Sequence, residues 1–407
     1  MSRARVAATA TTSLREVSTT SGDVHSTGVG ELDRVLGGGF IAGSTTLLFG
    51  EPGVGKSTLA LMSLRQLAAT STTVLLIAAE ESVGQVAQRA RRLGDVPQGL
   101  EVAATTNVAS VDRLLRERRP TLCVIDSISA MSDDALGNVA GSVPQVRHVA
   151  ERLCCVAKET GVALLIVGHV TKEGELAGPR ALEHLVDTVI RIEGDRNGSL
   201  RLIRALKHRF AATGEVGLLE MVPDGLREVP DATILRGPDL HVPGVVFTVT
   251  NDGSRSFLIE MQALVATSSA SPRRIAHQVS SQRLALLLAV LESRCAIDTS
   301  DLDVFAATAG GLPASEPGVD VALALAVASA ALNFAVPRSL AAMGEVGLAG
   351  ELRAVTSLTR RVREAQRLGA TRVVVPSDGD MEAVDGVEVI RCRTLAEAID
   401  VVQSVTN

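Results

Sequence analysis

Gly-Glu-Pro-Gly-Val-Gly-Lys-Ser at residues 50–57 decides the fold of the first half of this chain. An apolar run of strand length precedes it at residues 45–49, and residues 58–67 follow with the spacing of a helix. Strand, loop and helix in this order form a phosphate-binding loop, because glycines let successive backbone N–H groups turn inward around a phosphate. We therefore expect a bound nucleoside triphosphate; a glycine-rich turn that fits the pattern by chance is the weaker explanation.

The loop sequence also indicates which residues would bind the nucleotide, ATP, and its Mg²⁺. The ammonium group of Lys56 would reach the β- and γ-phosphates, and the hydroxyl group of Ser57 would be a ligand of Mg²⁺. The predicted nucleotide-binding residues are Gly50, Glu51, Pro52, Gly53, Val54, Gly55, Lys56, Ser57 and Thr58.

Length and composition indicate a soluble globular protein with more than one domain. The chain has 407 residues, of which 46% are hydrophobic and 21% charged, and one core rarely serves so long a chain. Its apolar runs, such as residues 163–167, are far shorter than the roughly 20 residues that cross a bilayer. The N-terminus lacks the apolar stretch of a secretion signal. We expect a cytoplasmic protein with no membrane partner.

Cysteines and charge exclude several classes of function. The five cysteines are an odd number without a C-x-x-C pair, so we expect neither a disulfide framework nor a zinc site. A formal net charge of −6 argues against a uniformly basic surface that coats nucleic acid. The chain has no Trp or Tyr, which argues against base stacking as the main mode of binding. Any contact with nucleic acid must then be local.

The pattern along the chain predicts two different architectures. Strand-length runs first alternate with helix-like segments, which indicates an α/β fold with a mostly parallel sheet covered on both faces. Three short strands near residues 188–192, 200–205 and 217–221 look like an antiparallel extension. Strands and helices then mix without strict alternation, which indicates α+β. The predicted parts are a flexible tail at residues 1–26, an ATPase domain at 27–228, a linker at 229–242 and a second domain at 243–407.

Carboxylates end two predicted strands, at the edge where parallel sheets place their ligands. Asp126 follows the apolar strand at residues 122–125 and would hold the magnesium ion; alternatively it caps the next helix. Glu80 and Glu81 end the preceding strand. One of them, with Glu80 preferred, would position the attacking water.

Two further features could sense or transmit the nucleotide state. His169 ends the strand at residues 163–167 after one glycine, so it could detect the γ-phosphate or simply cap the strand. The loop at residues 171–180 carries Lys172 and Arg180, which could bind a polyanion such as DNA. The alternative is an ordinary solvated loop.

Lys207 and Arg209 follow another predicted strand, within the sequence Lys-His-Arg-Phe. Two cations at a fixed spacing on a rigid element could complete the ATP site of a neighbouring subunit, as arginine fingers do. Ordinary solvated charges are the alternative.

These motifs resemble those of the bacterial RadA (Sms) family of DNA repair ATPases, over about residues 27–405. The lead-in at residues 27–39 is similar to that of RecA- and KaiC-like ATPases. The stretches at residues 141–147, 168–174 and 177–187 look like signatures of the RadA family itself.

The resemblance implies a RecA-like core followed by a Lon-protease-like domain, in a homo-oligomeric ring that we expect to be a hexamer. It also implies an ATPase stimulated by single-stranded DNA that moves on single-stranded or branched DNA and promotes branch migration beside a RecA-type recombinase. Two other functions stay open: a KaiC-like regulatory switch that acts on protein partners, and, less favoured, an ATP-dependent peptidase.

The chain departs from the family pattern at three places. One is the strand end at residues 79–82, where the family's Gly-Glu-Glu-Ser is Ala-Glu-Glu-Ser and both carboxylates are kept. The family opens with a four-cysteine zinc finger, whereas residues 1–26 contain no cysteine. The family motif Lys-Asn-Arg-Phe-Gly appears as Lys-His-Arg-Phe-Ala at residues 207–211, which keeps both cations but changes the timing that we expect for intersubunit catalysis.

The Lon-like part lacks the expected Ser–Lys dyad. Where Lon has Gly-Pro-Ser-Ala-Gly, residues 316–320 read Glu-Pro-Gly-Val-Asp, so Gly318 occupies the nucleophile position, and the lysine position falls near Thr359. We expect a peptidase-inactive domain kept for assembly or DNA contact. Arginines that could line a DNA path, or be ordinary solvated side chains, are Arg273, Arg274, Arg353, Arg360 and Arg361.

Overall fold

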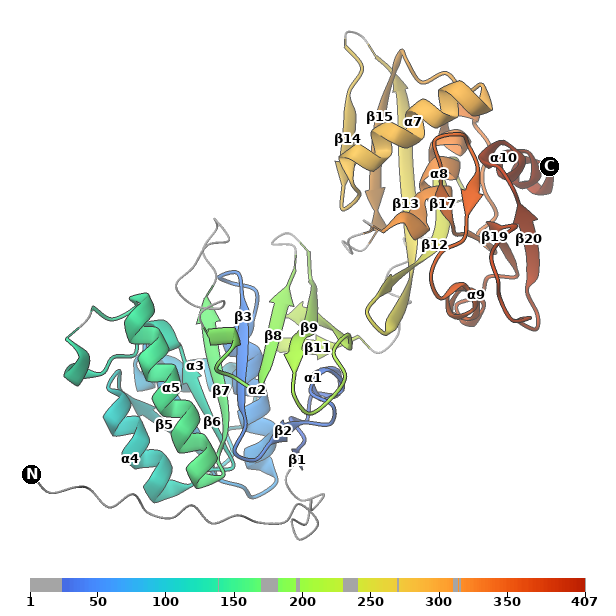
Figure 1. The fold of residues 1–407 in the computed structure, drawn as a ribbon. Coiled ribbons are helices and arrows are strands. Elements are labelled where there is room, and N and C mark those ends of the chain that lie inside the picture. Colours follow the sequence, from blue (N-terminus) through green and yellow to red (C-terminus); the bar gives the residue numbers. More distant parts are fainter. Residues whose placement is uncertain are drawn as a thin grey trace, which may run out of the picture. The chain divides into compact units, whose positions relative to one another are not determined.

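The described residues form two compact units in a computed structural model (Figure 1). One unit contains Met1–Arg191 and Leu206–Ala211, and the other contains Ile192–Ala205 and Ala212–Asn407. The structure describes residues 24–137, 139–169, 182–194, 198–229, 241–268, 271–309, 314 and 316–406.

A parallel sheet between helices forms the first unit, as the sequence predicts (Figure 1). The strands lie in the order β8-β3-β7-β6-β4-β5. Strands β3 and β4 are buried along their whole length, and β6 is buried up to Asp126, which explains their continuous apolar sequences. The strands are β3 (Thr45–Gly50), β4 (Val74–Ala78), β5 (Leu100–Ala104), β6 (Leu122–Asp126), β7 (Ala163–His169) and β8 (Thr188–Glu193).

Helices cover both faces of this sheet. Alternate strand residues such as Ile77 and Ile125 pack in one core with Leu115 of α4 and Val149 of α5. Helix α2 lies behind the sheet as it is drawn in Figure 1 and buries Leu64 completely. The helices are α1 (Gly30–Val35), α2 (Lys56–Ala69), α3 (Val83–Arg92), α4 (Val108–Arg118) and α5 (Val143–Thr160).

The predicted antiparallel extension is right for two of its three strands and wrong for β8. Strands β9 (Leu200–His208), β10 (Val216–Val222) and β11 (Gly225–Glu228) pair antiparallel, and of these β9 and β10 were predicted and β11 was not. Strand β8 instead pairs parallel with β3, with Thr188 level with Thr46. The chain returns from the end of β7 to the start of β3 before β8 begins, and such a crossover produces a parallel strand.

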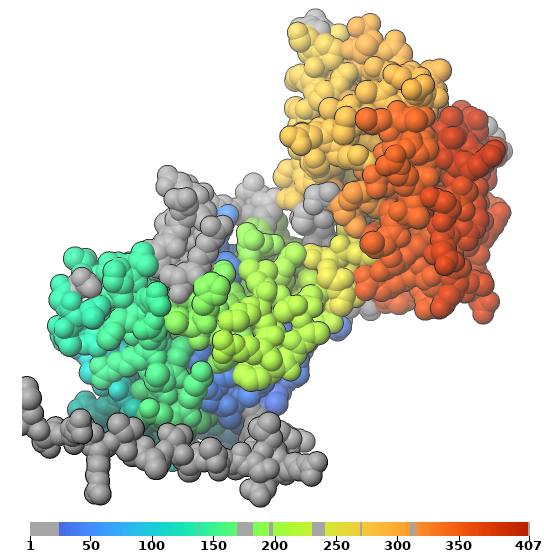
Figure 2. All heavy atoms as spheres, viewed as in Figure 1, coloured from blue at the N-terminus to red at the C-terminus, as the bar shows by residue number. Residues whose placement is uncertain are grey.

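The second unit contains a mixed seven-stranded sheet, which confirms the predicted α+β character. Its order is β14-β15-β13-β12-β16-β19-β20. In the space-filling view the orange and red segments of this unit form one continuous surface (Figure 2). The strands are β12 (Val245–Asp252), β13 (Arg255–Thr267), β14 (Arg274–His277), β15 (Leu302–Thr308), β16 (Leu340–Ala342), β19 (Arg372–Pro376) and β20 (Glu388–Cys392), beside a small hairpin of β17 (Glu345–Val346) and β18 (Leu352–Arg353).

Side chains alternate between two cores along the central strands of this sheet. Ile259 of β13 points into the core shared with α7, α8 and α10, whereas Leu258 points into the core under α9. Helix α8 is apolar around its whole circumference and buried from Asp320 to Ser329, as expected of a central helix. The helices are α7 (Ser281–Cys295), α8 (Asp320–Leu332), α9 (Leu358–Arg367) and α10 (Leu395–Thr406). No helix that the structure describes is long and apolar enough to cross a membrane.

A buried ion pair lies just before α8. Arg361 of α9 is 0% exposed and donates to Glu316 Oε2 at 2.6 Å and to Val249 O at 2.6 Å. Burial raises the pKa of Glu316, but the hydrogen bonds from Arg361 and from the backbone outweigh it and hold that pKa below its ordinary value. A Cβ atom added at Gly318 would lie 2.8 Å from Nη1 of Arg361. The guanidinium group therefore fills the space that any side chain at the nucleophile position would need.

We predict that Arg361→Met destabilises the second unit by about 3 kcal/mol, because it leaves the carboxylate of Glu316 partly buried without its partner. The control is Arg363→Met on the same helix, where an exposed pair with Glu382 is lost at a cost below about 1 kcal/mol. Urea unfolding followed by circular dichroism measures both. Equal losses in the two variants would contradict a structural role for the buried pair.

Candidate nucleotide-binding site

The parallel register brings the predicted catalytic residues to one edge of the sheet. Gly50 at the end of β3 is level with His169 at the end of β7. Ala78 at the end of β4 is level with Asp126 at the end of β6, and the next amide, Ala79 N, donates to Asp126 O at 2.9 Å. The phosphate loop, Asp126 and the residues that follow β4 therefore share the carboxyl edge.

The loop has the backbone shape that an anion requires. Gly53 and Gly55 have φ values of +81° and +111°, in the left-handed region that glycine tolerates. A Cβ atom added at Gly53 would meet nothing within 4 Å. Helix α2 begins at Lys56 without a side-chain cap, so Ser57 and Thr58 lie in a first turn whose N–H groups can bind a phosphate.

Lys56 lies across the loop, where the sequence places it. Its side chain is 4% exposed, and Nζ donates to Gly50 O at 2.8 Å and to Glu51 O at 2.9 Å. Burial lowers the pKa of Lys56, and the negative charges of Asp126 and Glu80 oppose that shift. One ammonium group is thus held beside two carboxylates at the mouth of the loop.

The three carboxylates have different partners. Ser127, directly after Asp126, donates its hydroxyl hydrogen to Glu80 Oε1. Glu81 pairs instead with Arg89 at 2.8 Å, and the same guanidinium lies 3.5 Å from Asp126 Oδ2. Glu80 is therefore joined to the residue beside the predicted metal ligand, whereas Glu81 is turned to helix α3. This difference favours Glu80 over Glu81 for positioning a water.

Ser57 and Asp126 are oxygen donors of the kind that Mg²⁺ prefers, and Mg²⁺ takes its remaining ligands from phosphates and water. No group of three or more His, Cys, Asp or Glu side chains in the described part of the chain could hold a metal ion alone. A magnesium site that is completed by the nucleotide fits this arrangement. The expectation of no zinc stays a prediction.

Three predicted site residues are not fully visible. The backbone of His169 ends β7 on the carboxyl edge, but its side chain lies outside the described residues. Lys172 and Arg180 also lie outside them. The sensor and DNA-binding roles stay predictions.

Lys207 and Arg209 lie at the opposite end of β3 from the phosphate loop. Nζ of Lys207 donates to Glu183 O at 2.7 Å and to Val186 O at 2.8 Å. Arg209 pairs with Asp187, whose carboxylate also accepts from Thr45 N, at the first residue of β3. Thr45 and Gly50 are five residue steps apart along the extended strand, a distance of about 17 Å. Neither cation is placed at the phosphate loop of its own chain.

His208 and Ala211, the two departures from the family motif, have local partners. Nδ1 of His208 accepts from Phe210 N and Ala211 N, both at 3.1 Å, so Nε2 carries the proton and donates to Leu36 O at 3.0 Å. The histidine thus ties the motif to the end of α1. A Cβ atom at Gly37 would lie 2.6 Å from the Ala211 methyl group, so glycine at 37 leaves room for alanine at 211.

The arginines proposed as a DNA lining have protein partners instead. Arg361 is buried, so that hypothesis is wrong for it. Arg273 pairs with Asp303 and Arg353 pairs with Glu351. Arg274 and Arg360 donate to backbone carbonyl groups.

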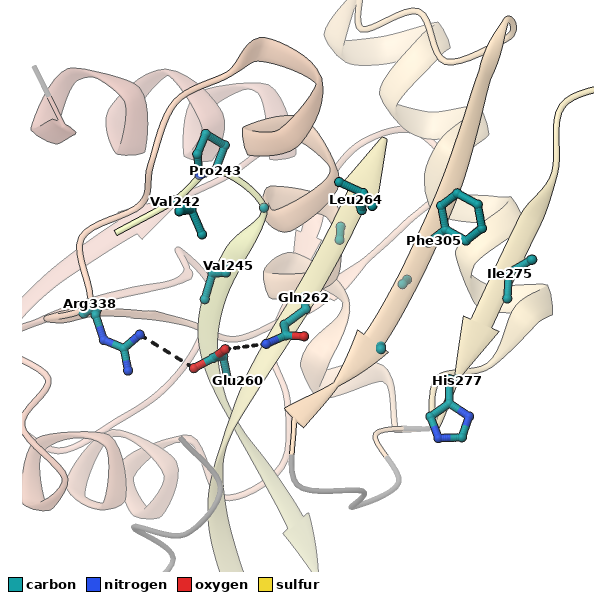
Figure 3. Close-up of a pocket in the computed structure, with 14 residues that line it drawn as sticks. Val242, Pro243, Val245, Glu260, Gln262, Leu264, Ile275, His277, Phe305 and Arg338 are labelled. Carbon is teal, nitrogen blue, oxygen red and sulfur yellow. Dashed lines mark hydrogen bonds and ion pairs between the residues drawn. The ribbon is translucent and has the colours of Figure 1, made fainter. Parts of the chain in front are cut away.

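A second concave site, of about 480 Å³, lies on the sheet of the second unit (Figure 3). Leu264, Ile275 and Phe305 line one side of it. At the other side Glu260 lies 3.8 Å from Arg338 and accepts from Gln262 at 2.6 Å. The charge of Arg338 is balanced by Glu260, so the pocket has a mainly apolar lining and not a basic one.

Arg89 and Ser127 were missed in the sequence. Ser127 could have been found, since it is adjacent to Asp126 and a hydroxyl group there can reach the neighbouring strand end. Arg89 meets Glu81 and Asp126 only because α3 folds back over the edge of the sheet, and no local pattern signals that contact.

Comparison with known proteins gives two domain matches. An AAA domain matches residues 13–175, and the Lon protease (S16) C-terminal proteolytic domain matches residues 288–406. These are the two domain types that the sequence motifs suggest, in the same order.

Full-length relatives decide the family. The DNA repair protein RadA of Pseudomonas aeruginosa is 45% identical over 391 residues, which cover 95% of this chain and 86% of that protein. This chain belongs to the RadA family. RadA of Mycolicibacterium smegmatis is 43% identical over 387 residues, covering 94% of this chain and 83% of that protein. RadA of Bacillus subtilis is 41% identical over 379 residues, covering 92% and 82%.

Two solved structures are also similar. The KaiC-like protein PH0186 from Pyrococcus horikoshii OT3 is 20% identical with a TM-score of 0.43, covering 51% of this chain and 99% of that chain. The RadB recombinase is 24% identical with a TM-score of 0.41, covering 50% and 99%.

We predict that Lys56→Ala weakens ATP binding about 10- to 100-fold, because charge-assisted hydrogen bonds contribute about 1.5–3 kcal/mol. Equilibrium titration with a fluorescent ATP analogue and Mg²⁺ measures the change. The control is Lys158→Ala, which removes an exposed lysine from α5 and should leave affinity unaltered. Unchanged affinity in the Lys56 variant would remove the argument for the phosphate loop.

Proposed function

We propose that this RadA-family chain hydrolyses ATP between the subunits of a ring and uses the cycle to move single-stranded or branched DNA during recombination. One observation carries the proposal: groups that suit ATP and Mg²⁺ gather at one edge of the sheet, while Lys207 and Arg209 are fixed at the other. The ring would be a cytoplasmic hexamer that works beside a RecA-type recombinase. Its predicted parts are an ATPase domain at residues 27–228, a linker at 229–242 and a peptidase-inactive domain at 243–407.

The chain's own residues divide the chemistry of hydrolysis. The loop amides and Lys56 bind the triphosphate, and Lys56 exchanges its two carbonyl partners for phosphate oxygens. Ser57 and Asp126 would hold Mg²⁺, which neutralises charge on the phosphates when it is bound. Glu80, oriented by Ser127, positions the attacking water and accepts its proton. His169 is proposed to sense the γ-phosphate from the same edge.

The placement of Lys207 and Arg209 supports catalysis across an interface. In the proposed ring, the sheet edge that carries the phosphate loop contacts one neighbour, and the opposite edge, which carries Lys207 and Arg209, contacts the other neighbour. Such a contact is head-to-tail. Repetition of such a contact closes a ring when the rotation permits. Each ATP would then lie between the loop of one subunit and the cations of the next, where a guanidinium group stabilises charge on the transferring phosphoryl group.

DNA binding is assigned to Lys172 and Arg180. Both residues follow β7 in the sequence, and the last residue of β7 lies on the same edge of the sheet as the phosphate loop. Arg273, Arg353 and Arg361 of the second unit are already paired with carboxylates, which supports a DNA contact at Lys172 and Arg180 over a lining made of those arginines. Phosphate contacts of this kind carry no sequence preference.

The peptidase function finds no support. Gly318 has no hydroxyl group, and the buried guanidinium of Arg361 occupies the space beside it. A nucleophile could not be accommodated at this position without moving α9.

We predict that single-stranded DNA raises the ATPase rate and that the stimulation declines as salt rises, because each phosphate contact releases counterions. Steady-state ATP turnover with and without oligonucleotide, over a salt series, measures this. A variant with both Lys172→Ala and Arg180→Ala should keep its basal turnover and show a shallower salt dependence. Turnover that ignores DNA at low salt would instead favour a KaiC-like switch acting on protein partners.

A mixing experiment tests the interface. We predict that Arg209→Ala binds ATP normally but hydrolyses it slowly, and that Glu80→Ala subunits restore turnover in mixed rings, since they supply an intact Arg209 to a neighbour's intact site. The control is a mixture of Glu80→Ala with Lys56→Ala subunits, in which neither partner supplies a working site, so no turnover should be restored. Mixed rings of the first kind that are no faster than the separate variants would count against action across an interface.

A further inference from the structure

We infer that Asp187 is the positioning residue for Arg209 and Lys207, and that it joins this cationic edge to the strand that carries the phosphate loop. The inference rests on the proposed function, because it assigns a task to Asp187 within the intersubunit ATP site.

Asp187 makes two pairs of hydrogen bonds, one to the first residue of β3 and one to Arg209. Toward β3, Oδ2 accepts from Thr45 N at 3.0 Å and the Asp187 amide donates to Thr45 O at 3.0 Å. Toward the end of β9, Oδ1 accepts from Arg209 Nη1 at 2.9 Å and Asp187 O accepts from Arg209 N at 3.2 Å. The side chain is only 5% exposed. Both the backbone and the guanidinium group of Arg209 are therefore fixed by one buried residue.

The pair still leaves Arg209 able to reach another molecule. Its side chain is 48% exposed although it is bound to Asp187. A guanidinium group has five N–H donors, so a single contact through Nη1 leaves most of its hydrogen-bonding capacity for phosphate oxygens. Fixing the group in advance lowers the entropy lost when it meets the nucleotide. Asp187 can thus orient Arg209 and still leave most of its N–H groups available to phosphate oxygens.

The same carboxylate also supports Lys207. Burial lowers the pKa of Lys207, and the nearby charge of Arg209 lowers it further, whereas the charges of Asp187 and Glu183 raise it. The carbonyl groups that hold Lys207 belong to residues 183 and 186, in the turn that ends at Asp187. Asp187, together with Glu183, therefore offsets the repulsion between two cations that are two positions apart in the motif.

The link to β3 connects the two halves of the ATP site within each subunit. Thr45, held by Asp187, is the first residue of β3, and Gly50, which opens the phosphate loop, is the last. A displacement of Arg209 by a neighbour's nucleotide acts on Asp187 and from there on the strand behind the subunit's own loop. Asp187 is the only residue described here that bonds to both Arg209 and β3 through its side chain.

The test uses Asp187→Asn, whose amide oxygen still accepts from Thr45 N but lacks the charge that holds Arg209. We expect normal binding of a fluorescent ATP analogue and turnover reduced about 10- to 100-fold, as misplaced catalytic groups typically produce. The matched control is Asp112→Asn, which removes a carboxylate that pairs with Arg116 and Arg152 on other helices. It should change turnover little.

Mixed rings then separate a positioning role from a merely structural one. Lys56→Ala subunits lack a working loop but offer an intact Arg209, so they should restore Asp187→Asn sites to about a quarter of the wild-type turnover at equal mixing in a head-to-tail ring. A parallel mixture of Arg209→Ala with Lys56→Ala tests the interface itself. If only the Arg209 variant is restored, Asp187 acts on its own loop and our inference is wrong. If neither is restored, the proposed intersubunit site fails instead.

A combined variant completes the test. If Asp187 acts through Arg209 and Lys207, adding Asp187→Asn to a variant that already carries Lys207→Ala and Arg209→Ala should slow turnover no further. Losses that add would overturn the inference. Should Asp187→Asn fail to fold, Asp187→Glu retains the charge with a longer reach, and its reduced turnover must then be restored by Lys56→Ala subunits; failure to do so would also overturn it.

Discussion

The parallel pairing of β3 with β7 on one side and β8 on the other is the constraint on which the site depends. It sets Gly50 level with His169 and Thr46 level with Thr188. Because side chains at strand ends inherit this register, anion-binding amides and carboxylates collect at one edge while two cations are fixed at the other. A shift of β8 by one residue against β3 would move Asp187, which joins Arg209 to Thr45. The two cations would then no longer be fixed at that edge, although every strand could remain paired.

The second unit depends on a different kind of interaction. Its core is apolar on both faces of the sheet, yet two ion pairs, Arg283 with Asp320 and Arg361 with Glu316, lie at and just before the start of α8. Burial raises the pKa of Asp320, and the bonds from Arg283 oppose that shift. Such pairs contribute little net stability compared with apolar side chains, but breaking one leaves a buried charge. They therefore fix how α7, α8 and α9 pack, with Arg361 so close to Gly318 that no side chain fits at that position.

The sequence predicts the site well where the chemistry is contiguous. Residues 50–57 contain a complete phosphate loop, and Asp126 follows an apolar run directly, so both could be located without coordinates. Strand β5 was missed because each of its residues is at least partly exposed and no continuous apolar run marks it. Asp187 could not be found, since its role depends on contacts with residues 142 positions earlier and 22 positions later. Arg361 was misread because a charged residue on a polar helix normally faces water, and only the position of Glu316 across the core reveals otherwise.

The bonds from Lys56 to the carbonyl groups of Gly50 and Glu51 have a consequence for the end of each cycle. When the nucleotide leaves, the ammonium group of Lys56 still has two hydrogen-bond acceptors within its own loop. It is therefore not left without partners. The loop competes with any nucleotide for the same cation, which lowers the affinity for product and triphosphate alike, and the triphosphate keeps the further bonds of its extra phosphoryl group. A loop that satisfies its own lysine is thus suited to the release of a spent nucleotide.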